Sequence, residues 1–264
     1  MHRSPLSADV VFRALPHFND PELARHARDR HRCGILTNSI FSGDSPEERV
    51  ARALGDRRAI SLKELLESFE FYSRTRKRLR SEQMADLCCG HGLTGLLFAL
   101  FERKVEGVTL MDRRRPASHD AILDAVCAVG PWVRDKVRYL ETDLGQAPAV
   151  LEAGTAILGV HACGTQTDAC ISTALVTGGP VAVMPCCYFQ TAHDAPSSIR
   201  GELGAELSAD IHRTYRMEAG GYKVDWTHIP RAITPMNRVL IGWHPIEEAS
   251  QGLARPQAAT CTDS

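Results

Sequence analysis

The sequence predicts an α/β fold in which a doubly wound sheet of seven strands follows a helical N-terminal extension. In the first 80 residues, apolar side chains recur at three- and four-residue spacing among charges, which is typical of amphipathic helices. Short apolar runs then alternate with helical stretches, as in a parallel sheet covered on both faces. Two strand-like runs near the end have no helix-length segment between them. They predict an antiparallel pair at one edge of the sheet.

The helices of the extension are predicted from caps and periodicity. Asp20-Pro21 and Ser45-Pro46 each match an N-cap followed by proline at the first helical position. Residues 61–81 form a strongly amphipathic pattern with a basic carboxyl-terminal end. No Gly/Ser linker follows, so we expect an extension over residues 1–80 that packs on a sheet domain of residues 81–246. The polar residues 247–264 predict a frayed tail.

Seven apolar runs predict the strands of the sheet domain. In chain order they are MADLCC, GVTLMD, VRYLETDL, AILGVHAC, PVAVMPCC, YKVDWTHIP and NRVLIGWHP. Helices are predicted between them in LTGLLFALFERK, HDAILDAVCAVG and DACISTALVTG. Each of the first five runs ends at a small or polar residue, which places candidate functional side chains at the carboxyl ends of the strands.

The composition narrows the class of protein. Hydrophobic residues make up 44% of the 264 residues and charged residues 24%, enough for a sizeable core. The formal net charge of −1 does not suggest nucleic-acid binding by bulk electrostatics, although residues 1–80 hold 16 basic against 11 acidic side chains. No apolar run reaches membrane-spanning length. The start of the chain lacks a secretory h-region, and nine cysteines do not resemble an extracellular disulfide framework. We therefore expect a soluble, cytoplasmic protein.

A glycine turn is the most informative motif. Gly90, Gly92 and Gly95 lie between an apolar strand and an apolar helix, where small residues let the backbone approach a nucleotide. Their spacing also matches the dinucleotide fingerprint, so a nicotinamide cofactor and a plain structural turn stay open as alternatives. Asp112, at the end of the next strand, is placed to accept the hydroxyls of an adenosine ribose. Asp86, before the turn, would orient the loop or meet an ammonium group.

Over about residues 70–245 the sequence resembles the class I S-adenosylmethionine-dependent methyltransferases. The resemblance rests on the D-x-C-x-G-x-G turn, the acidic end of the second strand, Asp143 after the third strand, and the reversed final strand. It implies a Rossmann-like seven-stranded methyltransferase sheet, S-adenosyl-L-methionine as donor and S-adenosyl-L-homocysteine as product. The donor-binding residues that it implies are Asp86, Cys88, Gly90, Gly92, Asp112, Arg113, Asp143, Leu144 and His161.

The fourth and fifth predicted strands end in a cysteine-rich rim. The segments His161-Ala162-Cys163-Gly164 and Pro185-Cys186-Cys187-Tyr188 meet there if the two strands are neighbours. These H-x-C-G and P-C-C-Y motifs resemble a narrower branch that includes a tRNA ribose 2′-O-methyltransferase. The zinc finger that delivers RNA in that enzyme has no counterpart in this sequence.

Three interpretations of the rim stay open. The cysteines can be small packing residues, or ligands of zinc or iron together with His161. Alternatively, His161 acts as a general base or orients the acceptor. The candidate catalytic residues are His161, Cys163, Cys187 and Tyr188. No residue is assigned to a metal, and a metal at the rim is the least favoured of the three.

The predicted function is methyl transfer from S-adenosylmethionine to a nucleophilic acceptor. Near-neutral charge favours a small-molecule acceptor, whereas the motifs and the basic front favour RNA as the alternative. A further alternative is a regulatory protein that binds S-adenosylmethionine without catalysis. No membrane partner is expected.

Overall fold

The computed structural model describes residues 10–188 and 195–244 of the chain. The predicted tail at residues 247–264, and the last two residues of the predicted sheet domain, lie outside the described residues. None of the helices in the described ranges is long and apolar enough to cross a membrane.

The first part of the chain is helical, as the sequence predicts. Its elements are η1 (Pro16–Asn19), α1 (Pro21–Ala24), α2 (Ile35–Ile40), α3 (Pro46–Asp56) and α4 (Leu62–Thr75). The two predicted N-caps are confirmed, because the side chain of Asp20 accepts from Glu22 N and that of Ser45 from Glu48 N. Helix α4 begins with a capping box and ends at Thr75, so of the basic end of the predicted helix over 61–81 it includes Arg74, and the basic residues from Arg76 to Arg80 follow it.

The second part alternates strands and helices. Its elements are β1 (Gln83–Leu87), α5 (Leu93–Phe101), β2 (Gly107–Asp112), α6 (Ser118–Cys127), α7 (Val133–Lys136), β3 (Val137–Glu141), η2 (Leu144–Gln146), α8 (Ala147–Val150), β4 (Ala156–Gly159), α9 (Thr165–Thr177), β5 (Val181–Val183), α10 (Ser197–Ala219), β6 (Lys223–His228) and β7 (Arg238–Trp243). The sequence did not predict α10.

The strands form one seven-stranded sheet in the order β3-β2-β1-β4-β5-β7-β6. Strands β1 to β5 pair in parallel, and β7 runs antiparallel to both β5 and β6. The predicted doubly wound sheet with an antiparallel pair at one edge is therefore confirmed.

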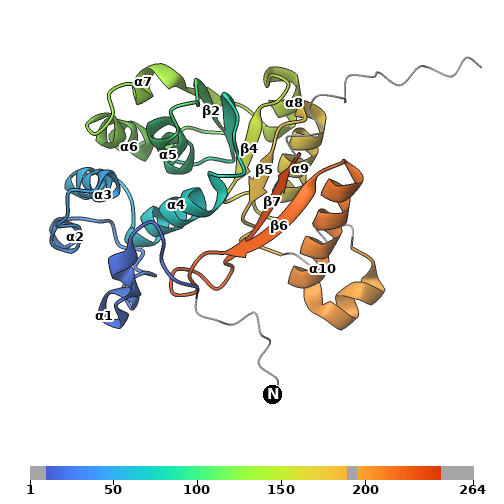
Figure 1. Cartoon of the computed structure of the whole chain (residues 1–264), viewed down its shortest axis with the longest axis horizontal. Coiled ribbons are helices and arrows are strands. Elements are labelled where there is room, and N and C mark those ends of the chain that lie inside the picture. Colours follow the sequence, from blue (N-terminus) through green and yellow to red (C-terminus); the bar gives the residue numbers. More distant parts are fainter. Residues whose placement is uncertain (1–9, 189–194, 245–264) are drawn as a thin grey trace, which may run out of the picture.

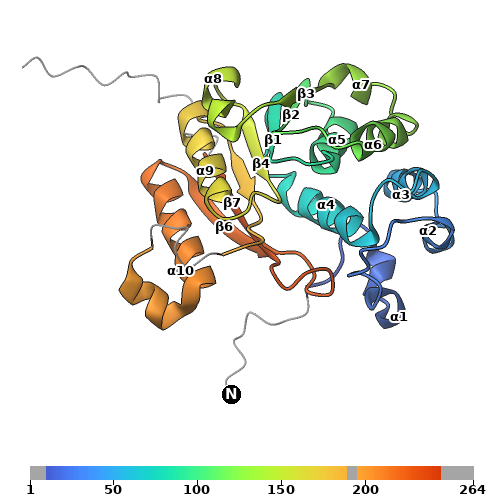
Figure 2. The same cartoon turned by 180° about the vertical axis from the view of Figure 1, so that it is seen from behind.

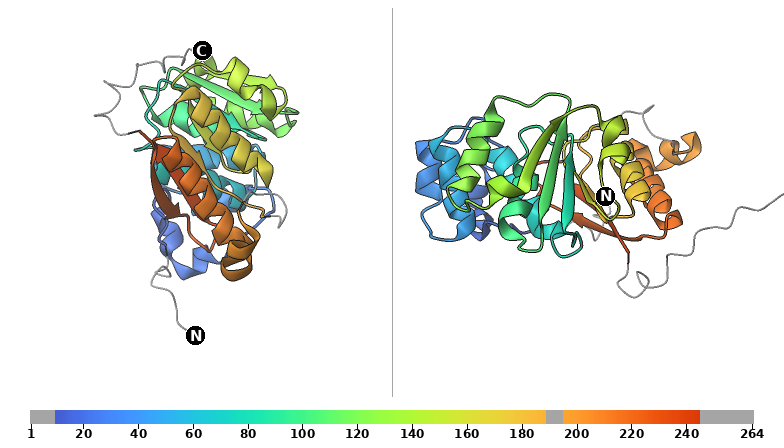
Figure 3. Two further views of the ribbon diagram at one scale, coloured as in Figure 1. Left: turned by 90° about the vertical axis from the view of Figure 1, so that its right-hand side faces the viewer. Right: turned by 90° about the horizontal axis from the view of Figure 1, so that it is seen from above.

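Helices cover both faces of the sheet (Figures 1 and 2). Helices α4, α5 and α6 lie on one face, and α9 and α10 on the other; seen from above in Figure 3, α1 to α3 lie at the end of the molecule far from α10. Side chains alternate between the faces, so that Leu110 of β2 belongs to one buried apolar cluster and Met111 to the other. The first cluster also includes Phe18 and Leu54, so the helical extension shares its core with the sheet.

The strands end earlier than the apolar runs suggested. Strand β1 stops at Leu87, β4 at Gly159 and β5 at Val183. The prediction that the rim residues terminate the strands themselves is therefore wrong, because His161, Cys163, Cys186 and Cys187 follow in loops. At the end of β5, the last hydrogen bond between β5 and β4 is donated by Met184 N to Gly159 O at 2.9 Å. Pro185 comes next and has no N–H to donate.

Candidate active site

The glycine turn after β1 has an unusual backbone. Cys88, Gly90 and Gly92 have φ values of 55°, 53° and 80°, in the left-handed region that side chains other than glycine adopt rarely. A Cβ at Gly92 would approach Leu110 Cδ1 to 2.6 Å, whereas one at Gly90 would meet nothing within 4 Å. Gly92 therefore lets the turn pack on β2, and Gly90 leaves an open face for a ligand.

Two aspartates hold this turn in place. Asp112 accepts from Gly90 N at 2.8 Å and from Arg113 N at 2.7 Å. Asp86 is 2% exposed and accepts from Gly95 N at 2.9 Å. Burial raises the pKa of Asp86 to about 7, the nearby Asp112 adds to the rise, and the hydrogen bond from Gly95 opposes it. Of the two predicted roles of Asp86, this geometry fits orientation of the loop.

A cavity of about 300 Å³ opens at the turn. Its lining comes from the end of β2, from the loops that follow β1, β2, β3 and β4, and from η2 and α9. It consists of Cys88, Gly90, Met111, Asp112, Arg113, Thr142, Leu144, His161 and Gln166. Most of the predicted donor-binding residues are in this set. The predicted Asp86, Gly92 and Asp143 are not, and Asp143 instead pairs with Arg113 at 3.2 Å. Met111 and Thr142 adjoin predicted residues, so the strand ends could have indicated them.

A second cavity, of about 720 Å³, lies beside the first. It is lined by the segment between α1 and α2, by the start of α4, by the loop after β4, by the loop between β6 and β7, and by residues 185–188 after β5, called the cysteine loop below. The lining residues are Arg28, Arg30, Ser61, Lys63, Glu64, Glu67, His161, Cys186, Cys187, Ile233, Thr234, Pro235 and Met236. His161 belongs to both cavities. The helical extension thus forms one wall of the larger cavity.

His161 faces a buried carboxylate. Its Nε2 lies 3.8 Å from Oε2 of Glu67, whose side chain is only 3% exposed. The other carboxylate oxygen, Oε1, pairs with Lys63 Nζ at 2.5 Å, whereas Oε2 has no hydrogen-bond partner among the described residues. Desolvation lowers the pKa of His161 and the Glu67 carboxylate opposes that fall, so the imidazole is neutral at pH 7.

Sequence reasoning missed Glu67. The residue lies on the apolar side of the amphipathic pattern, in LLESFEF, where a carboxylate is out of place. That position is the one signal that could have indicated it, because charged side chains are rarely buried without a partner or a function.

Three sulfur atoms meet at the rim. Cys163 Sγ lies 2.9 Å from Cys186 Sγ, which lies 3.8 Å from Cys187 Sγ, and all three are within 4.8 Å of one another. The alternative of a four-ligand site made by His161 and these three cysteines is not assembled, because His161 is outside this group among the described residues. Burial raises the pKa of Cys163 and of Cys186, so both are thiols at neutral pH.

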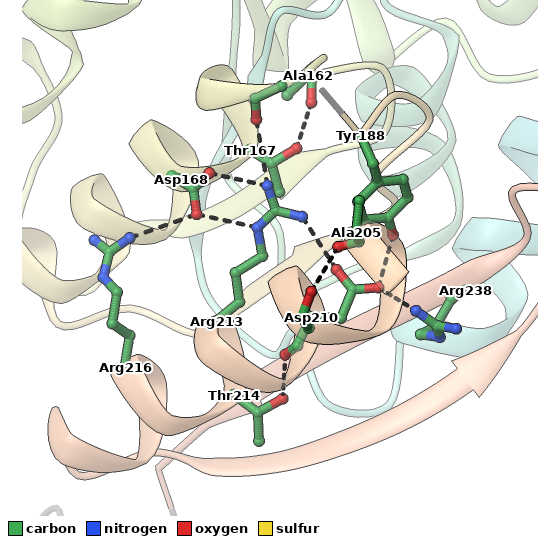
Figure 4. A network of polar contacts seen from close by, with 12 residues as sticks. Ala162, Thr167, Asp168, Tyr188, Ala205, Asp210, Arg213, Thr214, Arg216 and Arg238 are labelled. Atoms are coloured by element: carbon green, nitrogen blue, oxygen red, sulfur yellow. Dashed lines mark hydrogen bonds and ion pairs between the residues drawn. The ribbon is translucent and has the colours of Figure 1, made fainter. Parts of the chain in front are cut away.

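Tyr188 is not among the residues that line the two cavities, and its side chain points into a network of polar contacts (Figure 4). Its hydroxyl donates to Asp210 at 2.6 Å, and Asp210, which is fully buried, also pairs with Arg213 at 3.1 Å and Arg238 at 2.5 Å. Arg213 in turn pairs with Asp168 at 2.9 Å. The network joins α9, α10 and β7 to the cysteine loop.

Comparison with known proteins yields structural similarity alone. No protein-family model matches the chain, and no curated protein matches it. Among solved structures, the fibrillarin pre-rRNA processing protein of Methanococcus jannaschii is 19% identical over 62% of this chain and 67% of its own, with a TM-score of 0.42. Precorrin-6y C5,15-methyltransferase of Geobacter metallireducens is 13% identical over 67% and 89%, with a TM-score of 0.44. A protein of Corynebacterium glutamicum is 13% identical over 80% and 96%, with a TM-score of 0.49.

The order and directions of the strands identify the fold. Five parallel strands, helices on both faces and a reversed strand β7 beside β5 reproduce the sheet that the sequence resemblance implies. The chain has the class I methyltransferase fold.

Proposed function

We propose that this chain is an S-adenosylmethionine-dependent methyltransferase that acts on a small molecule with an acidic O–H or N–H group. The observation that carries the proposal is the position of His161 in the walls of both cavities. A donor in the smaller cavity and an acceptor in the larger one would meet beside its imidazole.

The smaller cavity suits the adenosylmethionine donor. Asp112 keeps free lone pairs after its two backbone contacts, so its carboxylate binds the ribose hydroxyls. Gly90 has open space where a side chain would stand, which lets the backbone approach the ligand. Cys88, Arg113 and Leu144 complete the walls. Asp86, Gly92 and Asp143 do not line the cavity but support residues that do. Asp86 and Gly92 hold the glycine turn, and Asp143 holds Arg113.

His161 acts as the general base. Bound in the cavity, adenosylmethionine supplies a methyl group on a positively charged sulfur. Neutral His161 takes the proton of the acceptor as the acceptor attacks, and Glu67 stabilises the imidazolium that forms. Proximity supplies the rest, because the two cavities hold the reactants side by side. Cys187 lines the acceptor side, and Cys163 lies in the neighbouring loop.

A small acceptor fits the charge distribution better than RNA does. The most basic groove, of about 1040 Å³, is lined by Arg74, Lys77, Arg78, Arg80 and Lys223 together with Trp226 and Trp243. Arg80 precedes β1 and Lys223 begins β6, so the groove lies at the amino ends of these strands. His161 follows the carboxyl end of β4, at the opposite end of the sheet. Among the described residues, Arg28, Arg30 and Lys63 are the cations that line the larger cavity, where they would bind one anionic group of a small molecule.

Calorimetric titration with S-adenosylhomocysteine tests the donor site. We expect micromolar binding by the native protein and a loss of at least about tenfold in Asp112→Ala, because the ribose hydroxyls lose their acceptor. Asp124→Ala, which removes an exposed carboxylate that does not line the cavity, is the matched control and keeps the affinity. Binding of NADH in place of S-adenosylhomocysteine, or equal binding by both variants, contradicts the proposal.

Methyl transfer to fractionated cell extract tests the chemistry. His161→Ala should keep its affinity for S-adenosylhomocysteine while transfer of a labelled methyl group falls by about 10²- to 10⁴-fold. Label in small-molecule fractions with weak salt dependence supports the proposed acceptor. Label in RNA that falls steeply with salt supports the alternative, and binding without transfer to any fraction leaves the regulatory role.

A further inference from the structure

The three cysteines of the rim converge because of where their strands end. Strands β4 and β5 are neighbours, so the loop with Cys163 and the loop with Cys186 and Cys187 leave the sheet side by side. Adjacent residues of a regular strand point to opposite faces. Cys186 and Cys187 lie beyond the last residue of β5, however, and their Sγ atoms are 3.8 Å apart. Both thiols can therefore reach one point.

The distances suit a tetrahedral metal. Zinc binds thiolates at about 2.3 Å, which separates two sulfur ligands by roughly 3.8 Å in a tetrahedral site. The Cys186–Cys187 separation has this value, and the 2.9 Å between Cys163 and Cys186 needs to widen by less than about 1 Å. The three side chains are half-buried.

The polar network around Asp210 and Arg213 holds both the loop with Cys163 and the loop with Cys186 and Cys187. Tyr188, next to Cys187, donates to Asp210 at 2.6 Å. Arg213 pairs with Asp210 and donates to the carbonyl oxygen of Gly164, next to Cys163, at 3.3 Å. One buried ion cluster therefore sets the spacing of the two loops, as expected for the support of a metal site.

We propose that Cys163, Cys186 and Cys187 form a binding site for a thiophilic divalent cation of the zinc type. Three protein ligands leave a fourth position for water or a substrate atom. Cys186 and Cys187 line the larger cavity, so that position faces the space assigned to the acceptor. The site stands on the three thiols alone and goes beyond the proposed methyl transfer.

Cation binding displaces the thiol protons. A divalent cation binds the thiolates and releases these protons. Affinity is therefore expected to rise with pH.

Zinc competition against a chromophoric chelator tests the site. The full-length protein, kept reduced, should bind one equivalent of zinc, and cobalt should give a thiolate-to-metal charge-transfer band in the near ultraviolet. Cys163→Ser and Cys187→Ser should each weaken zinc binding by at least about tenfold and reduce the cobalt band. Cys127→Ser, a half-buried cysteine on α6, is the matched control and binds like the native protein.

Other results overturn the site. They are an absence of stoichiometric zinc, zinc binding by Cys163→Ser equal to that of Cys127→Ser, or a Cys163–Cys186 disulfide detected by mass in the reduced preparation. Thermal melting and S-adenosylhomocysteine affinity verify that each variant is folded. His161→Ala should keep its zinc affinity, and a tenfold loss there would overturn the three-cysteine set. These measurements do not depend on methyl transfer, so failure of either proposal is seen separately.

Discussion

Two buried carboxylates in this molecule differ in how completely they are paired. Asp210 on α10 is fully buried and both of its oxygens are engaged, one by Arg213 and the other by Tyr188 and Arg238. Glu67 on α4 is almost as buried, yet within residues 10–188 and 195–244 only its Oε1 has a close partner, Lys63. Its Oε2 faces His161 at 3.8 Å across the edge of the larger cavity.

This difference in pairing indicates a structural role for Asp210 and a different role for Glu67. Buried polar groups are nearly always satisfied, because desolvation without a partner is costly. Asp210 follows this rule and acts as the centre of a structural cluster. Glu67 departs from it at a cavity wall, and in the proposed mechanism its unpaired oxygen stabilises the imidazolium of His161. Mutations at the two sites should therefore affect different measurements.

Asp210→Ala should give the larger effect, on stability. Removal of the carboxylate leaves Arg213 and Arg238 without their shared partner, and loss of one member of a buried ion pair costs about 3–5 kcal/mol. Denaturant unfolding measures the change. Asp124→Ala breaks an exposed pair and should stay within about 0.5 kcal/mol of the native protein. Equal stability of the two variants would mean that the cluster does not hold the loops.

Glu67→Gln should leave folding nearly unchanged and affect turnover. The carboxylate raises the pKa of His161, so its removal lowers that pKa. Activity rises with pH as His161 loses its proton, and the acid limb of the pH–rate profile should therefore shift to lower pH. Turnover at neutral pH should fall roughly 10-fold, less than on removal of the base itself.

Two controls separate this effect from damage to the fold. S-Adenosylhomocysteine affinity should stay unchanged in Glu67→Gln, because the carboxylate does not line the donor cavity. Glu64→Gln removes a second carboxylate of the same cavity wall, which raises the pKa of His161 less than Glu67 does, so the acid limb should move less than in Glu67→Gln. An acid limb that stays in place, or that moves equally in both variants, argues against a partnership of Glu67 with His161.

The sequence predicted the topology well because strand and helix periods are local signals. It failed for α10, and the reasons are visible in that helix. Gly204 has a φ of 77° and kinks it, and its buried side includes Asp210 and Arg213 where an apolar stripe would be expected. The partners of those two charges come from α9, β7 and the cysteine loop, distant in the chain.

The candidate site was predicted in part for the same reason. Gly90 and Asp112 belong to a local strand–turn–helix pattern, and the structure brings both to one cavity. Glu67 reaches His161 only after α4 packs against the carboxyl edge of the sheet, a contact between residues 94 positions apart that no local period encodes. The strands were predicted too long at the rim because cysteine counts as apolar, whereas Pro185 ends the ladder.

Tyr188→Phe should have the smallest effect and sharpens the same comparison. As an acceptor-side residue predicted from sequence, Tyr188 would affect turnover on loss of its hydroxyl. As an anchor of the cysteine loop, it loses one hydrogen bond to Asp210, which still keeps Arg213 and Arg238. We then expect a loss of about 1 kcal/mol in unfolding free energy and a change in turnover well below that of Glu67→Gln. A turnover loss above about tenfold at native stability would instead place the hydroxyl on the acceptor side.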